Sequence, residues 1–290
     1  MPDLSGRLAI LAGKGRFPVL VARAARDMGH NPFIVAIRGE ADQDWSGFDH
    51  CQISIADLAQ LARTIRREAI GSVVFAGGID RRPDLANLRP TWRSLMALPA
   101  FLRVFAAGGD DKILRFAIRV LEKEGVKVLA AQQIAPDLLG TPGPLAQMRP
   151  GKSDWRDIEA AGAVALALGR LDVGQGSVSV GGRVIALEGL EGTDAMLARV
   201  KELRASKRLT VPGGVLVKMC KPDQDERADL PSIGPLTVIN AHAAGLAGIA
   251  VEAGRALVLE REQVIDEANR LGLFVIGIKP ANPEAVQCQP

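Results

Sequence analysis

Short apolar runs alternate with amphipathic helical patterns, and this alternation constrains the fold of the chain more than any other feature. In the N-terminal half the apolar runs cover residues 8–13, 32–37, 71–77 and 125–130. The helical patterns cover 17–28, 55–69, 94–107 and 111–124. Strands without polar alternation are buried on both faces, so the pattern predicts an α/β domain with a Rossmann-like parallel sheet. Right-handed crossovers would place the carboxyl ends of the strands, and any bound ligand, at one edge.

The C-terminal half has a different pattern. Residues 135–152 are rich in glycine and proline, and they divide a predicted N-terminal domain, 1–134, from a C-terminal domain, 135–290. Two β-rich runs joined by Gly181-Gly182 predict a hairpin over 176–187. The small apolar residues of 241–254 favour a buried helix or a turn-rich segment. Further helices are expected at 154–171, from 193 through 203 and at 262–271, and further strands at 213–217, 256–259 and 273–276. The C-terminal domain is therefore predicted to be mixed α/β.

Composition excludes several classes of function. Aromatic residues make up 4% of the chain and the net charge is +3, which argues against a nucleic-acid partner. Cys51, Cys220 and Cys288 are far apart, a spacing that fits neither a disulfide framework nor a zinc site and that suits a reducing cytoplasm. No apolar run reaches the length of a membrane span. We expect a cytoplasmic protein, with attachment to a membrane surface left open.

The densest group of reactive side chains lies between Lys218 and Pro231. It follows an apolar strand and contains two lysines, one arginine, four carboxylates and one glutamine. Carboxylates at the end of a buried strand suit a hard cation, and lysine or arginine beside them suits a phosphate. A solvated charged loop is the alternative, with about even weight on the composition alone. Our hypothesis is that this is the catalytic loop.

Glycine-rich turns follow the predicted N-terminal strands. Gly13-Lys14-Gly15 is half of a dinucleotide fingerprint, but Pro18 stands where the third glycine belongs. An NAD-dependent oxidoreductase is therefore a weaker alternative, and a tight turn without ligand explains the glycines equally well. Gly77-Gly78 likewise follows a predicted strand, and Asp80 lies two residues further on. Asp110-Asp111 could bind ligand or could simply place favourable charge at a helix start.

Several of these motifs together resemble a known family. Gly174-Gln175 with the hairpin, residues 191–194, and 218–231 followed by Gly234-Pro235 resemble the LpxI-type UDP-2,3-diacylglucosamine pyrophosphatases. This type is distinct from the calcineurin-like phosphoesterases that perform the same reaction in other bacteria. Residues 77–83 and 109–111 extend the resemblance over nearly the whole chain. The chain departs from the family pattern at Asp223, usually glycine, and at Ser232, usually threonine, so Asp223 is given no role.

The resemblance implies an enzyme of lipid A biosynthesis. It would hydrolyse a lipid-linked nucleotide sugar, UDP-2,3-diacylglucosamine, to UMP and 2,3-diacylglucosamine 1-phosphate (lipid X), by water attack on the phosphorus at the sugar side. A divalent metal, Mg²⁺, would assist, and the protein would lie peripherally on the cytoplasmic face of the inner membrane. A non-catalytic protein that binds the nucleotide or lipid intermediate is the rival hypothesis. The chain could also form a homo-oligomer, since its sequence does not fix the oligomeric state.

Roles follow for individual residues. Asp225 is the first candidate for metal ligand or water-orienting base, and Asp229 is the second metal ligand. Lys218, Lys221 and Arg227 would hold phosphate oxygens, and Gln224 would orient water or substrate. Thr193 or Asp194 is expected to cap the helix that follows. Further substrate-binding residues are expected at Gly13, Gly15, Gly77, Gly78, Asp80, Asp111, Glu191, Thr193 and Asp194.

Overall fold

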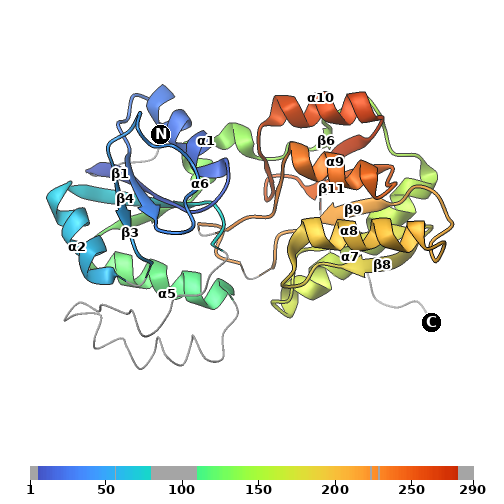
Figure 1. Ribbon diagram of the computed structural model, residues 1–290, viewed down its shortest axis with the longest axis horizontal. Coiled ribbons are helices and arrows are strands. Elements are labelled where there is room, and N and C mark those ends of the chain that lie inside the picture. Colours follow the sequence, from blue (N-terminus) through green and yellow to red (C-terminus); the bar gives the residue numbers. More distant parts are fainter. Residues whose placement is uncertain (1–5, 56, 80–109, 223, 228, 280–290) are drawn as a thin grey trace. The chain divides into compact units, whose positions relative to one another are not determined.

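A computed structural model describes residues 6–55, 57–79, 110–222, 224–227 and 229–279. The chain separates into two compact units (Figure 1). The N-terminal unit contains Met1–Pro136 together with Asp225–Asp229, and the C-terminal unit contains Asp137–Gln224 and Leu230–Pro290. Asp80, the predicted helix at 94–107, Asp223 and the side chain of Asp111 lie outside the described residues.

The N-terminal unit contains a parallel sheet, as predicted, and the sheet has five strands. Its strand order is β3-β2-β1-β4-β5. The strands are β1 (Arg7–Ala12), β2 (Phe33–Ile37), β3 (His50–Ile53), β4 (Ile70–Ala76) and β5 (Lys127–Leu129). The edge strand β3 was not predicted, because two of its four residues are exposed and Ile53 alone is fully buried. An edge strand of this kind carries no apolar run for a sequence pattern to detect.

Helices cover both faces of this sheet. They are α1 (Phe17–Asp27), α2 (Leu58–Arg67), α5 (Asp110–Lys123) and α6 (Ala131–Ile134). Alternate residues of β1 separate the two faces: Leu8 and Ile10 pack with α1 and α6, while Ala9 and Leu11 pack with α2 and α5. The apolar run of β1 from Leu8 to Ala12 is therefore explained by burial on both sides.

The C-terminal unit contains a six-stranded mixed sheet in the order β6-β13-β11-β9-β7-β8. Its three central strands are parallel, whereas β6 and the β7–β8 hairpin run antiparallel to their neighbours. The strands are β6 (Gly143–Pro144), β7 (Gly176–Val180), β8 (Arg183–Leu187), β9 (Val215–Lys218), β11 (Gly248–Glu252) and β13 (Phe274–Ile278). A separate parallel pair joins β10 (Ser232–Ile233) to β12 (Leu257–Val258). The predicted hairpin is confirmed, and Gly181 and Gly182 take the positive φ angles, 65° and 81°, that its two-residue turn requires.

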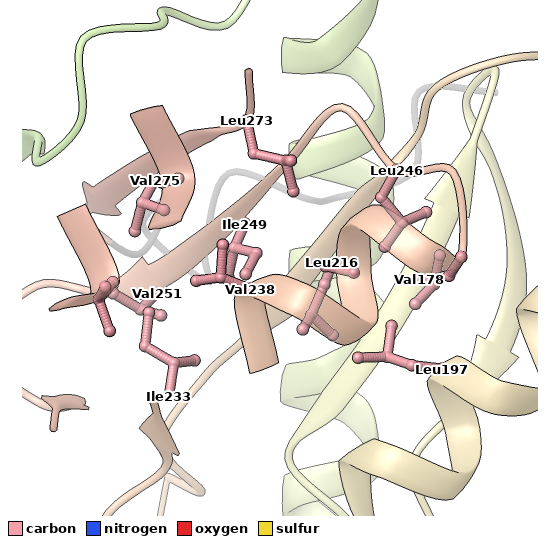
Figure 2. Packing of buried hydrophobic residues seen from close by; sticks show 14 of the residues in the cluster. Val178, Leu197, Leu216, Ile233, Val238, Leu246, Ile249, Val251, Leu273 and Val275 are labelled. Carbon is pink, nitrogen blue, oxygen red and sulfur yellow. The ribbon is translucent and has the colours of Figure 1, made fainter. Parts of the chain in front are cut away.

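Two layers of helices enclose this sheet. One face packs against α7 (Lys152–Arg170), and the other packs against α8 (Gly192–Ala205), α9 (Pro235–Ala243) and α10 (Arg261–Leu271). Strand β9 serves both layers, since Val215 and Val217 face α7 while Leu216 faces the other helices. Figure 2 shows the cluster on the side of α8, α9 and α10, in which Leu216 of β9, Ile249 of β11 and Val238 of α9 take part.

Three local predictions for this unit differ from the structure. Residues 241–254 are not a helix or a turn-rich segment: they end α9 and then form the central strand β11. Glycine is needed at the start of β11, because a Cβ at Gly248 would lie 2.4 Å from the ring of Phe274. Helix α7 begins at Lys152 rather than at the predicted residue 154, so Asp154 lies in its first turn, where its Oδ2 accepts the Gly151 N–H at 2.8 Å. The glycine- and proline-rich segment contributes an edge strand, β6.

Candidate active site

Several chain segments place polar side chains at one edge of the C-terminal sheet. Strand β7 is antiparallel to both β8 and β9, so these two strands run in the same direction and end at the same edge. Lys218 is the last residue of β9 and lies opposite Gly176. Glu188 follows the last residue of β8. Ligands in open α/β sheets bind at the carboxyl ends of the parallel strands, which is where Lys218 lies.

The ammonium group of Lys218 lies among three acceptors. Its Nζ donates to Thr193 Oγ1 at 2.8 Å and to the Ser232 carbonyl at 3.2 Å, and it lies 3.5 Å from Glu188 Oε1. The side chain of Lys218 is only 7% exposed. Thr193 also donates its hydroxyl proton to Glu188. Lys218, Thr193 and Glu188 thus form a closed polar cluster, called here the lysine cluster.

Sequence reasoning missed Glu188 as a member of this site. The residue is 7% exposed, and its Oε2 accepts the Gln175 N–H at 3.3 Å. Burial acts to raise the pKa of Glu188, but the charge of Lys218 and the hydrogen bonds outweigh it, so the pKa lies below its ordinary value. A signal was available, because a carboxylate that directly follows a hairpin strand reaches the same edge as Lys218.

Three predicted substrate-binding residues lie at the start of α8: Glu191 directly precedes the helix, and Thr193 and Asp194 lie in its first turn. The cap prediction is wrong: the residue before the helix is Glu191, which makes no side-chain cap bond, and Thr193 is committed to the lysine cluster. Asp194 Oδ1 instead accepts from Asn240 of α9 at 2.9 Å. Glu191 pairs with Arg199 at 3.1 Å. Of these three residues, Thr193 is the one that the structure bonds to Lys218.

The start of the predicted catalytic loop packs on the C-terminal unit. Lys221 Nζ pairs with Asp172 Oδ1 at 2.7 Å, in the turn after α7. Gln224 folds back, and its Oε1 accepts the Lys221 N–H at 3.3 Å. Gly169 permits this packing, because a Cβ at that position would lie 3.1 Å from Lys221 Cα. Lys221 and Gln224 therefore hold the base of the loop in this conformation.

Asp225 and Arg227 belong to the N-terminal unit and bind each other. Arg227 donates from Nε to Asp225 Oδ1 at 2.9 Å and from Nη2 to Oδ2 at 2.7 Å. Its Nη1 donates to Glu122 of α5 at 2.7 Å. The hydrogen bonds from Arg227 are the main reason that the pKa of Asp225 lies below its ordinary value, and the same pairing raises the pKa of Arg227. Asp229 is exposed.

The glycine turns of the N-terminal unit meet where β1 and β4 end. The Lys14 N–H donates to the Gly78 carbonyl at 2.8 Å, and a Cβ at Gly13 would lie 2.3 Å from that oxygen. Gly77 has a φ of 92°, and a Cβ there would lie 2.7 Å from the Lys14 carbonyl oxygen. The structure thus brings Gly13, Gly77 and Gly78 together. The Gly15 N–H donates to Asp42 Oδ1 at 2.9 Å, and Asp42 lies in the segment after β2.

Two carboxylates, Asp225 and Asp229, are the predicted ligands of a metal ion. Among the described residues, no group of three or more His, Cys, Asp or Glu side chains is placed to hold a metal ion. Mg²⁺ in enzymes of phosphate chemistry commonly takes one or two carboxylates and completes its shell with substrate phosphate oxygens and water. Asp225 and Asp229 would supply the two carboxylates of such a Mg²⁺ site. Arg227 currently occupies both oxygens of Asp225.

Comparison with known proteins defines the class of protein to which this two-unit α/β chain belongs. Residues 7–138 match the family model of the LpxI N-terminal domain, and residues 141–276 match that of the LpxI C-terminal domain. The chain therefore belongs to the LpxI family, which confirms the resemblance seen in its sequence. It is 40% identical over 280 residues to the UDP-2,3-diacylglucosamine pyrophosphatase LpxI of Caulobacter vibrioides. That similarity covers 94% of this chain and 98% of the relative.

Proposed function

We propose that this chain is a hydrolase of lipid A biosynthesis that cleaves the pyrophosphate of UDP-2,3-diacylglucosamine. The products are UMP and 2,3-diacylglucosamine 1-phosphate. The observation that carries the proposal is the 40% identity, over nearly the full length of both chains, to a protein named for this activity. The buried lysine cluster supports it, because a cation at the edge of the sheet suits an anionic phosphate substrate.

The proposed reaction is attack by water on the phosphorus at the sugar side of the pyrophosphate. The bond from that phosphorus to the bridging oxygen breaks, and the bridging oxygen leaves with UMP. Lys218, at the edge of the C-terminal sheet, neutralises negative charge on the phosphate oxygens as this bond breaks. Asp225 is ionised at neutral pH, and its pKa is lowered further by the hydrogen bonds from Arg227, so it suits orientation of the water or metal binding better than storage of a proton. In ¹⁸O-labelled water the label should appear in the sugar phosphate; label in UMP would overturn this assignment.

We propose that Mg²⁺ is held by Asp225 and Asp229 together with substrate phosphate oxygens. When bound, it neutralises charge on the phosphate and polarises the phosphorus–oxygen bonds. Arg227 would then exchange its contact with Asp225 for one with the phosphate. Chelation should stop the reaction, and added Mg²⁺ should restore it. Full activity in excess EDTA would remove the metal from this mechanism.

We propose further that the protein lies on the cytoplasmic face of the inner membrane. Across the described ranges, the structure has no helix with the length and apolar character of a membrane span. Leu190 and Leu236 are 93% and 58% exposed, and they follow Glu188 and Ser232 closely in the chain. Such side chains suit shallow insertion beside a lipid substrate.

Co-sedimentation with vesicles tests this membrane contact. Vesicles that contain anionic lipid should bind the wild type, and Leu190→Ser with Leu236→Ser should weaken that binding. Val211→Ser is the control, since Val211 is also exposed but precedes β9 at the opposite edge of the sheet. Equal loss of binding in the control would contradict the assignment of the surface.

An assay of UMP release tests the proposed activity. Purified protein is incubated with UDP-2,3-diacylglucosamine in detergent micelles, and the uridine products are separated. Release of UMP supports hydrolysis. Binding of the substrate without UMP release would instead support a non-catalytic binding protein.

A further inference from the structure

The carboxylate of Glu188 contacts every other member of the lysine cluster. Its Oε1 accepts the Thr193 hydroxyl and lies 3.5 Å from Lys218 Nζ, while Oε2 accepts the Gln175 N–H. Among the described residues, Glu188 is the one carboxylate within ion-pair distance of Lys218. Thr193 accepts from Lys218 and donates to Glu188, so its hydroxyl proton has a fixed direction. One buried carboxylate therefore fixes both the ammonium and the hydroxyl at the edge of the sheet.

The neighbouring backbone leaves space for this carboxylate. A Cβ at Gly176 would lie 2.8 Å from Glu188 Oε2, and a Cβ at Gly174 would lie 2.1 Å from the Glu188 carbonyl oxygen. Neither glycine has a positive φ angle, so close approach rather than backbone conformation requires them. The start of β7 is therefore shaped around Glu188.

We propose that Glu188 is a positioning residue for pyrophosphate hydrolysis: it holds the Lys218 ammonium and the Thr193 hydroxyl where they meet a substrate phosphate. This inference rests on the proposed function. Lys218 is then ready to exchange the Ser232 carbonyl for a phosphate oxygen while Glu188 and Thr193 keep it in place. Glu188 itself does not contact the substrate.

The effect of removing the charge of Glu188 depends on the other charged and polar groups around Lys218. Glu188 faces it from the end of β8, Thr193 from α8 and the Ser232 carbonyl from β10. Glu252 at the end of β11 is committed elsewhere, to the Cys220 N–H at 2.8 Å and to Arg255 at 3.1 Å. Removal of the Glu188 charge should therefore leave Lys218 with neutral partners.

Glu188→Gln is the test, because it keeps the size of the side chain and removes its charge. We expect kcat for UMP release to fall about 10- to 100-fold, since small misplacements of a catalytic group have effects of this size. The alkaline limb of the pH profile should move to lower pH, because a buried ammonium without its counter-ion loses its proton more easily. Glu188→Asp should restore part of the rate. Glu267→Gln removes an exposed partner of Arg270 on α10 and should change neither rate nor profile.

A second measurement does not depend on catalysis. The rate at which acetic anhydride labels Lys218, followed by peptide mass spectrometry across pH, reports the protonation and exposure of its amine. Labelling should begin at lower pH in Glu188→Gln than in the wild type. Wild-type labelling behaviour in this variant would overturn the positioning role even if the chain proved not to hydrolyse this substrate. Absence of UMP release by the wild type, with the labelling shift present, would overturn the proposed function alone.

Thr193 provides a second route if Glu188→Gln does not fold. Thr193→Val keeps the shape of the side chain and removes the hydroxyl bridge between Lys218 and Glu188. We expect lower kcat and earlier labelling of Lys218 in Thr193→Val, with both restored in Thr193→Ser. Unchanged behaviour in a folded Thr193→Val would contradict the positioning network.

Discussion

The buried pair of Lys218 and Glu188 makes a quantitative prediction about stability. Lys218→Met removes the ammonium and leaves a carboxylate whose side chain is 9% exposed, without its counter-ion. Breaking one partner of a buried ion pair typically costs about 3–5 kcal/mol. We therefore expect the C-terminal unit of Lys218→Met to lose about that much free energy of unfolding at pH 7. Arg270→Met, which breaks an exposed pair with Glu267, should cost about 0.2–1 kcal/mol.

The sign of the pH dependence identifies Glu188 as the cause. In the wild type the pKa of Glu188 is lowered, so the pair stabilises the fold at pH above the unfolded-state value and loses this effect as pH falls through the folded-state value. In Lys218→Met, burial is no longer outweighed, and the pKa of Glu188 should lie above its ordinary value. That variant should regain stability as pH falls from 7 to 5, so its difference from the wild type should narrow.

Hydrogen exchange followed by mass spectrometry measures this effect within one unit. Peptides that contain Gly176–Val180 and Val215–Lys218 report the unfolding of the C-terminal sheet separately from the other unit. At pH 7 their slowest exchange should accelerate by about 100-fold or more in Lys218→Met, since each 1.4 kcal/mol is tenfold. A further change of Glu188→Gln in the same chain should recover most of the loss. An exchange difference that stays constant between pH 7 and 5, or that the double variant does not relieve, would refute the reasoning.

Two further substitutions test other parts of the fold. Gly13→Ala places a Cβ 2.3 Å from the Gly78 carbonyl oxygen and should destabilise the N-terminal unit by about 1–3 kcal/mol in a thermal melt, whereas Gly47→Ala, with open space around it, should not. Asp157→Ala removes the acceptor of the Ser179 hydroxyl and of two turn amides, and it should cost the C-terminal unit at least about 2 kcal/mol, measured by exchange of the hairpin amides.

Much of the fold could be predicted because burial on both faces leaves a direct trace in the sequence. Strand β1 is apolar from Leu8 to Ala12, and the hairpin of β7 and β8 carries a turn, Gly181-Gly182, that few other structures would need. Strand β11 escaped prediction although it too is buried on both faces. Its first residue, Gly248, is required by the close approach of the Phe274 ring on the neighbouring strand, and that contact depends on tertiary structure. The edge strand β3 escaped because its residues are largely exposed.

The sequence indicated several residues of the candidate site, but not which of them contact one another. The charged loop identified Lys218 and Asp225 as candidates, while the ammonium's actual partners come from the ends of other elements. Thr193 looked like a helix cap, yet its hydroxyl bonds to Glu188 and Lys218. Which residues become partners depends on the strand order. Strands β8 and β9 are not adjacent, because β7 lies between them, but both end at the same edge of the sheet. A single sequence holds no local pattern for such a relation.

Hydrolysis of the pyrophosphate is the central claim, and UMP release by the wild type and by Asp225→Ala measures it most directly. Both proteins are first shown by circular dichroism to be folded, and binding of UDP-2,3-diacylglucosamine is measured for each. The wild type should convert the substrate to UMP and 2,3-diacylglucosamine 1-phosphate in the presence of Mg²⁺, while Asp225→Ala should bind it and release no UMP. A wild type that releases no UMP would contradict the activity, and an Asp225→Ala variant with near-full activity would contradict the site.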